Sequence, residues 1–224
     1  MHIDILSEDV SGKTALEILV PKIIDLNVHT FTIHSYKGIG KLPKKLGSNG
    51  KASHRILLDQ LPRILQGFGR THEGWGKSFP AAVVLVCDLD NRVLSDFVDE
   101  LKSLLKQCSP APLTVFCIAI EEGEAWLLGD IDAIMKAYPS ADKNVLLSYQ
   151  NDSICGTWET LADAVHVGGA ANLKKQGFPA SGKAKHEWAK TIAPHLDVEE
   201  NRSPSFQYFR RKLNSLVSSS ESNE

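Results

Sequence analysis

The feature that most limits how this chain can fold is an alternation of short apolar runs with longer segments of helical periodicity. Four runs of strand length occur early in the chain, at 3–6, 29–36, 82–87 and 113–120. Apolar residues at three- and four-residue spacing mark helices between and after them, at about 15–24, 56–65 and 93–105. Strands alternating with helices predict an α/β fold with a parallel sheet flanked by helices. The unbroken run AAVVLVC is typical of a strand buried on both faces.

Expected helix ends and a change of pattern after residue 130 divide the chain into parts. Ser11 is placed to cap the first helix and Pro21 to kink it. After residue 130 the pattern weakens into short helices and Gly-bearing turns, with one longer helix at about 206–217. We therefore expect an α/β core over 1–135, a helical C-terminal extension over 136–217 packed on it, and a disordered tail at 218–224.

Composition excludes several classes of protein. Of the 224 residues 42% are hydrophobic and 23% charged, which is ordinary for a soluble globular chain. No apolar stretch reaches 18 residues and the N-terminus lacks the pattern of a signal peptide, so we expect a cytoplasmic protein with no membrane partner. The four cysteines form no CxxC pair for zinc or redox chemistry, and Cys87 and Cys117 lie in apolar runs where buried thiols are expected.

The net charge of −2 hides an uneven distribution. Residues 36–80 carry nine Lys or Arg against two Asp or Glu, whereas residues 81–135 carry three against ten. Much of the basic block lies in the Gly- and Lys-rich segment 37–53, with Lys41, Lys44 and Lys45. One interpretation is two solvated faces; the other is a surface that binds a polyanion such as nucleic acid, beside carboxylates that need a cation.

Carboxylates follow three of the four predicted strands. In a parallel sheet, ligands bind at the carboxyl ends of the strands. The strands run into Glu8-Asp9, Asp88-Leu89-Asp90 and Glu121-Glu122-Gly123-Glu124, and the candidate site residues among these are Glu8, Asp88, Asp90, Glu122 and Glu124. Asp88 and Asp90 would point the same way in an extended chain, and such oxygen ligands suit Mg²⁺ or Mn²⁺. The alternative is that Asp88 or Asp90 caps the helix that begins near Val93.

A Glu after the first strand and an Asp-x-Asp after a later one resemble the Toprim fold of topoisomerases, primases and nucleases. Four longer pieces are similar to an uncharacterised Toprim-like family of bacterial proteins. They are VLVCDLDN (84–91), IAIEEGEAWLLGD (118–130), HEWAKTIAPHLD (186–197) and NRSPSFQYFRRKL (201–213). The resemblance extends over most of the chain.

The resemblance implies roles for the strand-end carboxylates. It makes Asp88 and Asp90 metal ligands and Glu8 the general acid/base or a further ligand, and it implies a second metal site at Glu122 and Glu124. A chain this short leaves little room for the domain that supplies the nucleophilic tyrosine of topoisomerases. The implied activity is therefore Mg²⁺- or Mn²⁺-dependent hydrolysis of phosphodiesters by a nuclease. The family's resemblance to components of defence operons implies an ATPase partner protein.

Weaker signals leave alternatives open. Ser11-Gly12-Lys13-Thr14 is similar to the end of a Walker A loop without its first glycine, and it places Lys13 near a phosphate at a helix N-terminus. Arg202 is a candidate phosphate ligand, although a solvated helix face explains it equally well. A non-catalytic subunit that binds an ATPase or nucleic acid is the alternative to an enzyme, and oligomeric state and the choice between DNA, RNA and nucleotide stay undetermined.

Overall fold

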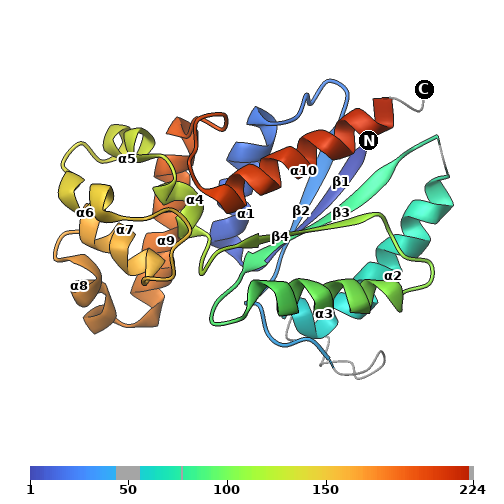
Figure 1. Cartoon of the computed structure of the whole chain (residues 1–224), viewed down its shortest axis with the longest axis horizontal. Coiled ribbons are helices and arrows are strands. Elements are labelled where there is room, and N and C mark those ends of the chain that lie inside the picture. Colours follow the sequence, from blue (N-terminus) through green and yellow to red (C-terminus); the bar gives the residue numbers. More distant parts are fainter. Residues whose placement is uncertain (44–55, 77, 222–224) are drawn as a thin grey trace.

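The fold is an α/β sandwich around one parallel sheet, as the strand and helix alternation predicts. A computed structural model describes residues 1–43, 56–76 and 78–221. Its sheet has the strand order β2-β1-β3-β4, and every neighbouring pair is parallel (Figure 1). The strands are β1 (His2–Ser7), β2 (Thr30–Ser35), β3 (Ala81–Asp88) and β4 (Thr114–Ala119). Each begins and ends within one residue of its predicted run, because the apolar runs are the segments that the sheet buries.

The alternation of side chains along the strands creates two separate cores. Ile3 and Ile5 of β1 belong to the larger core, whereas Leu6 belongs to the smaller one on the opposite face. Helices α1 (Val10–Leu19) and α10 (Pro204–Glu221) contribute to the larger core. Helices α2 (Leu57–Trp75) and α3 (Leu94–Lys106) contribute to the smaller one. The sheet is thus covered on both faces, which explains why β3 is apolar along its length.

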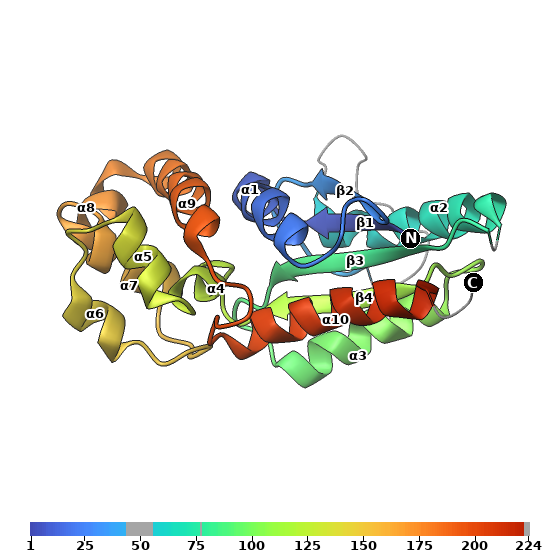
Figure 2. The same ribbon diagram turned by 90° about the horizontal axis from the view of Figure 1, so that it is seen from above.

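The chain between β4 and α10 forms a helical lobe beyond the carboxyl ends of the strands (Figure 2). Its helices are α4 (Glu124–Leu128), α5 (Ile131–Ala137), α6 (Lys143–Ser148), α7 (Thr157–Val165), α8 (Gly169–Gln176) and α9 (Phe178–Ile192), followed by the 3₁₀ helix η3 (Ala193–His195). Helix α9 packs against α1, and α10 then returns along β4. Trp126 and Trp188 are both buried within this packing, as core residues rather than exposed stacking platforms.

Several predicted helix ends are wrong. The N-cap of α1 is Asp9 and not Ser11, because the Asp9 carboxylate accepts a hydrogen bond from Gly12 N at 2.7 Å. Pro21 does not kink a continuous helix; α1 ends at Leu19 and Pro21 lies in the 3₁₀ helix η1 (Val20–Lys22). Helix α2 continues ten residues past its predicted end. Helix α10 continues to Glu221, so residues 218–221 are helical and not a disordered tail; residues 222–224 lie outside the described residues.

Other predictions concern cysteines and membranes. Cys87 and Cys117 are buried as predicted, and all four cysteines are free thiols. Among the described residues, no helix combines the length and apolar character that crossing a bilayer requires.

The strand order reverses at the boundary between β1 and β3. The chain leaves β1 through α1 toward β2, and it leaves β3 through α3 toward β4 on the other side. Helices α1 and α3 lie on opposite faces of the sheet, so a crevice opens where the carboxyl ends of β1 and β3 meet. This topological switch point is the place where open α/β sheets bind ligands.

A buried carboxylate in the middle of β1 is bonded by two histidines. Asp4 of β1 is 4% exposed, and it accepts hydrogen bonds from His34 Nε2 at 2.7 Å and His72 Nε2 at 3.0 Å. Burial by itself raises the pKa of Asp4, but the hydrogen bonds from His34 and His72 outweigh it, so the pKa lies below the ordinary value of 3.8.

We expect Asp4→Asn to lower the free energy of unfolding by about 1–3 kcal/mol at neutral pH, because the amide is a weaker acceptor for two histidines. A carboxylate with a depressed folded-state pKa stabilises the protein above its unfolded pKa, and this contribution disappears as pH falls through the folded value. Urea unfolding from pH 7 to 3.5 should therefore show the difference shrinking below pH 4, about the unfolded pKa of an Asp. The exposed control Asp99→Asn should show no such trend; a pH-independent loss would contradict the linkage.

Candidate functional site

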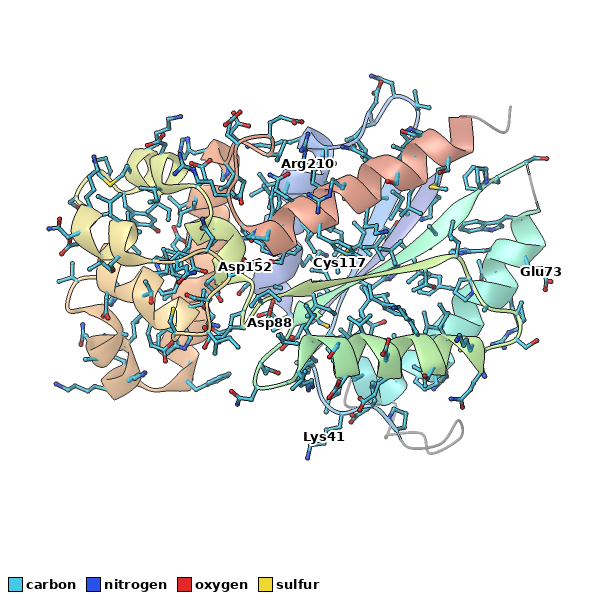
Figure 3. All side chains as sticks on the ribbon, viewed as in Figure 1. Lys41, Glu73, Asp88, Cys117, Asp152 and Arg210 are labelled. Carbon is cyan, nitrogen blue, oxygen red and sulfur yellow. The ribbon has the colours of Figure 1, made fainter. Side chains whose placement is uncertain are left out.

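The carboxyl ends of β1, β3 and β4 surround a small pocket at the switch point. Its volume is about 70 Å³. Glu8 follows β1, Asp88 ends β3 and Glu124 begins α4 after β4, and all three line the pocket together with Lys185 of α9. Figure 3 shows Asp88 at the end of the sheet that faces the helical lobe. Most of the remaining lining is apolar, with the side chains of Ala15, Leu16, Leu19, Val86, Trp126, Leu127 and Ala189. Acidic groups thus lie against an apolar wall.

Glu8 and Asp88 are directly linked through the backbone. The backbone N–H of Asp88 donates to the side-chain oxygen Oε2 of Glu8 at 3.2 Å. Burial raises the pKa of Glu8 to about 7; the Asp88 N–H opposes this shift, whereas Asp90 and Asp9 add to it. Burial, and next the negative charge of Glu8, also raise the pKa of Asp88 well above its usual range. Two such groups do not readily carry charge together at neutral pH without a nearby cation.

Lys185 is the cation that the structure places among these carboxylates. Its Nζ lies 3.2 Å from Glu122 Oε1 and 3.2 Å from Glu124 Oε2. Burial by itself lowers the pKa of Lys185, but the negative charges of Glu124 and Glu122 raise it above the ordinary value. For Glu122, burial raises the pKa more than Lys185 lowers it. The lysine is therefore held charged, while one lysine does not fully compensate the surrounding carboxylates.

The turn between β1 and α1 fixes the position of Glu8. Asp9 caps the helix through Gly12, and a Cβ added to Gly12 would lie only 2.7 Å from Ser7 Oγ. A larger residue at this position would have to displace the Ser7 hydroxyl. Ser11 and Gly12 line the pocket, whereas Lys13 pairs with Glu17 at 3.5 Å and does not. The similarity to a Walker A loop is thus accounted for by a capped turn.

The Glu121–Glu124 turn is held by helix α7. Glu121 has φ of 59° and accepts hydrogen bonds from the backbone of Cys155, Gly156 and Thr157, and from the Thr157 hydroxyl. Burial raises the pKa of Glu121, but these hydrogen bonds outweigh it and leave the pKa below its usual value. Glu122 Oε2 accepts from Trp158 N at 3.1 Å. The N-terminus of α7 therefore orients the acidic turn.

Asp90 does not lie beside Asp88 as predicted. The extended conformation ends at Asp88, and Asp90 has φ of 50°, so the two side chains do not follow strand alternation. The Asp90 carboxylate instead pairs with Arg92 Nη1 at 2.9 Å, and Arg92 also donates to Gly40 O at 3.2 Å. Asp90 is close enough to raise the pKa of Glu8 but does not line the pocket. Neither Asp caps α3, whose N-cap is Val93 without a side-chain hydrogen bond.

The predicted phosphate-binding residues that the structure describes do not line the pocket. Lys41 is exposed, and its backbone N–H donates to Asp59 at 2.8 Å. Lys44 and Lys45 lie outside the described residues. Arg202 is exposed, its backbone N–H donates to Gly129 O at 2.8 Å, and it does not line the pocket.

Sequence reasoning missed Lys185 and Arg92, the two cations that pair with predicted site carboxylates. Lys185 is one of several lysines on α9, with Lys183 and Lys190 nearby, and periodicity gives no reason to single it out. Arg92 could have been identified more easily from the sequence than Lys185, since it lies two residues after Asp90. Only the docking of α9 against α1 and the end of the sheet selects Lys185.

The Ser203–Phe206 element has a structural role near the site. Ser203 Oγ donates to Asp152 Oδ1 at 2.7 Å and accepts from Phe206 N at 3.2 Å, so it caps α10. Ser205 Oγ accepts from Trp126 Nε1 at 3.0 Å. These bonds tie the start of α10 to α4, the helix that carries Glu124.

The fit of a divalent cation can be judged from the donor set. Glu8, Asp88, Glu122 and Glu124 offer hard oxygen atoms of the kind that Mg²⁺ and Mn²⁺ prefer. Burial is the main reason that the pKa values of Glu8, Asp88 and Glu122 are raised. Within the described ranges, no three Asp, Glu, His or Cys side chains are already arranged around one ion position. The oxygen donors of the site thus suit a divalent cation, although Lys185 already pairs with two of the carboxylates.

Comparison with known proteins gives a family but no function. Residues 8–214 match the profile of a family described as "Domain of unknown function (DUF4276)". No curated protein and no solved structure gives a significant match. The matched segment begins at Glu8 and includes every carboxylate of the pocket. Since the match extends over most of the chain, this protein belongs to the DUF4276 domain family.

Proposed function

We propose that this protein is a Mg²⁺- or Mn²⁺-dependent phosphodiesterase of the Toprim type, and specifically a nuclease. The observation that carries the proposal is the convergence of Glu8, Asp88 and Glu124 from three strand ends on one pocket. The pocket volume of about 70 Å³ suits a hydrated cation or a phosphate group rather than a nucleobase. The base would then lie outside the pocket, and the site would act on the backbone of the substrate.

Each group in the pocket has a chemical task in this proposal. Glu8, Asp88 and Glu124 would hold the cation, with Glu122 at the second position that the Toprim resemblance implies. A bound cation would polarise the phosphodiester and stabilise its developing negative charge. With a pKa of about 7, Glu8 is able to hold or release a proton at neutral pH, as a general acid or base requires. The first turn of α1 lines the pocket, and a helix N-terminus attracts phosphate.

One observation favours a second candidate, a non-catalytic subunit that binds an ATPase partner or nucleic acid. Lys185 already bridges Glu122 and Glu124, so part of the negative charge is offset without a metal ion. If the acidic residues of a Toprim fold only balance the charge of a lysine, the protein is a stable scaffold that catalyses no reaction. In this case Asp88 would bind no divalent cation.

Hydrolysis assays with Asp88→Asn test the first candidate. Purified protein is incubated with double- and single-stranded DNA, RNA and bis(p-nitrophenyl) phosphate, with Mg²⁺, Mn²⁺ or EDTA. We expect metal-dependent cleavage that Asp88→Asn lowers by at least about 100-fold, since removing one charge-stabilising group from such a site has effects of this size. The control Asp96→Asn alters an exposed carboxylate in the first turn of α3 and should leave the rate unchanged.

Calorimetry separates the two candidates. Metal binding that disappears in Asp88→Asn, together with cleavage of one substrate class, supports the enzyme. Cleavage that persists in Asp88→Asn would mean that a contaminant or another site is responsible. Absence of both metal binding and cleavage would favour the scaffold and its partner.

A further inference from the structure

A second and much larger cavity lies along the free edge of the sheet. Its volume is about 680 Å³, within the range of ligand-binding pockets. It is a groove between α3 and α10, and its floor is β4, the last strand of the sheet (Figure 2). The lining is largely apolar, with Val98 and Leu105 from α3, Phe116 and Ile118 from β4, and Tyr208 from α10. Leu94 and Tyr208 are 41% and 40% exposed.

The backbone of β4 offers unpaired hydrogen-bonding groups to this groove. Val83 N–H donates to Leu113 O at 2.8 Å, and Leu89 N–H donates to Ala119 O at 2.9 Å. These two bonds fix the register, so residues 113, 115, 117 and 119 bond to β3. In a parallel ladder the intervening residues direct their N–H and C=O groups the other way. The outward groups of Phe116 and Ile118 pair with no residue in the part of the chain that the structure describes. Such an edge is a template for one more strand.

The rim of the groove is basic. Lys102 of α3 and Arg211 and Lys212 of α10 line it. Lys102 has a weak surface pair with Asp99 at 3.7 Å, and no carboxylate among the described residues pairs with Arg211 or Lys212. The one acidic residue of the lining, Asp152, already accepts hydrogen bonds from Ser203 Oγ at 2.7 Å and Ser205 N at 2.6 Å. The groove therefore complements negative charge.

From these three observations we propose that the β4 groove binds an extended peptide segment of a partner protein, with alternating apolar and acidic side chains, by strand addition. Main-chain bonds to Phe116 and Ile118 provide the pairing. Alternate side chains of an added strand lie on opposite faces of the sheet, so the apolar ones face Val98 and Leu105 of α3 and the acidic ones face Arg211 and Lys212 of α10. Self-pairing of two β4 edges is disfavoured because it brings two basic rims together. A nucleic acid would meet the same charges but cannot continue the backbone ladder.

A peptide-binding experiment tests the proposal. The probe is an octapeptide of alternating Glu and Val, capped at both ends and fluorescently labelled. The comparison peptides carry Lys in place of Glu, or Pro in place of every second Val. We expect saturable binding of the Glu/Val peptide in fluorescence anisotropy. The Lys peptide should not bind, because the rim repels it, and the Pro peptide should not bind, because it lacks the N–H groups of the ladder.

Two further measurements make the result specific to the groove. The double variant Arg211→Glu/Lys212→Glu should weaken binding by about 10-fold or more, since two favourable charge contacts become repulsive. The matched control Lys106→Glu alters an exposed lysine of α3 outside the groove and should bind as wild type. In hydrogen exchange, the amides of Phe116 and Ile118 should become protected on binding, whereas those of Val115 and Cys117 are protected already.

Several results would overturn the proposal. No binding of the Glu/Val peptide, or binding without a change at the Phe116 and Ile118 amides, would remove strand addition. Single-stranded DNA that protects the same two amides would assign the groove to nucleic acid instead. Concentration-dependent dimerisation that protects them would make the groove an interface between two copies of this chain. None of these outcomes depends on hydrolytic activity, so the test is independent of the proposed enzyme function.

Discussion

Replacing Lys185 with Gln is expected to lower the free energy of unfolding by about 3 kcal/mol, the largest stability effect of any single change considered for this site. The Lys185 side chain is 20% exposed and bridges Glu122 and Glu124, whose side chains are 21% and 8% exposed. Removing the lysine leaves both carboxylates desolvated without a cation beside them, and breaking a buried ion pair from one side costs more than the pair contributes. Urea unfolding at pH 7 in EDTA measures the effect.

Two variants show whether the loss comes from uncompensated charge. Lys190→Gln removes an exposed lysine from the same helix and should change stability by no more than about 0.5 kcal/mol. Adding Glu124→Gln to Lys185→Gln should recover part of the lost stability, because one of the stranded charges is removed. If the double variant is less stable than Lys185→Gln alone, the loss comes from packing and not from charge.

Divalent cations offer a further readout of the same variant. If the carboxylates bind Mg²⁺ or Mn²⁺, Lys185→Gln frees Glu122 and Glu124 for the ion and should bind it more tightly than wild type. The ion should then raise the unfolding free energy of the variant more than that of wild type. No metal-dependent gain in either protein would favour the scaffold interpretation.

Replacing Glu8 with Gln is expected to stabilise the metal-free protein at alkaline pH by about 2–3 kcal/mol. In the folded protein the pKa of Glu8 is about 7, against an ordinary value of 4.5, because burial disfavours its charged form. A carboxyl group with a raised folded-state pKa binds its proton more tightly in the folded protein. Wild type therefore loses stability as pH rises from 4.5 to about 7, and the full penalty is present above that value.

The glutamine variant carries no charge at this position at any pH. In urea unfolding with EDTA, its free energy of unfolding should equal that of wild type near pH 5 and exceed it at pH 8. Glu17→Gln, an exposed residue of α1 that pairs with Lys13, is the matched control and should not change the pH profile. Equal stability of wild type and Glu8→Gln at pH 8 would show that Glu8 is not held in a desolvating site. A stability gain accompanied by loss of hydrolysis would be the usual trade-off of an active-site residue.

Different parts of the molecule were predictable for different reasons. The strands were predicted within one residue because burial of a strand depends on local apolar runs. The helix ends were less predictable. Asp9 and Ser11 are both good N-cap residues, and the helix begins at Val10 with the Asp9 carboxylate bonded to Gly12 N. The length of α2 was underestimated because its second half is less apolar than the first.

Strand-end carboxylates that look equivalent in the sequence have different partners in the structure. Asp88 and Asp90 share one short motif, yet Asp88 faces the pocket and Asp90 pairs with Arg92. The difference arises because the strand ends between them and Asp90 adopts a left-handed conformation, which its pairing with the Glu121 backbone fixes. A two-residue spacing predicts a shared direction only while the chain remains extended.

The sequence by itself determined the class of fold and the edge of the sheet at which acidic residues would gather. Both follow from local periodicity and from the common direction of parallel strands. Tertiary structure alone decided that Lys185 would neutralise part of this acidic group and that β4 would be left as an open edge between two helices. Strand order and the docking of α9 and α10 bring together residues up to about 180 positions apart, and no local pattern encodes such contacts.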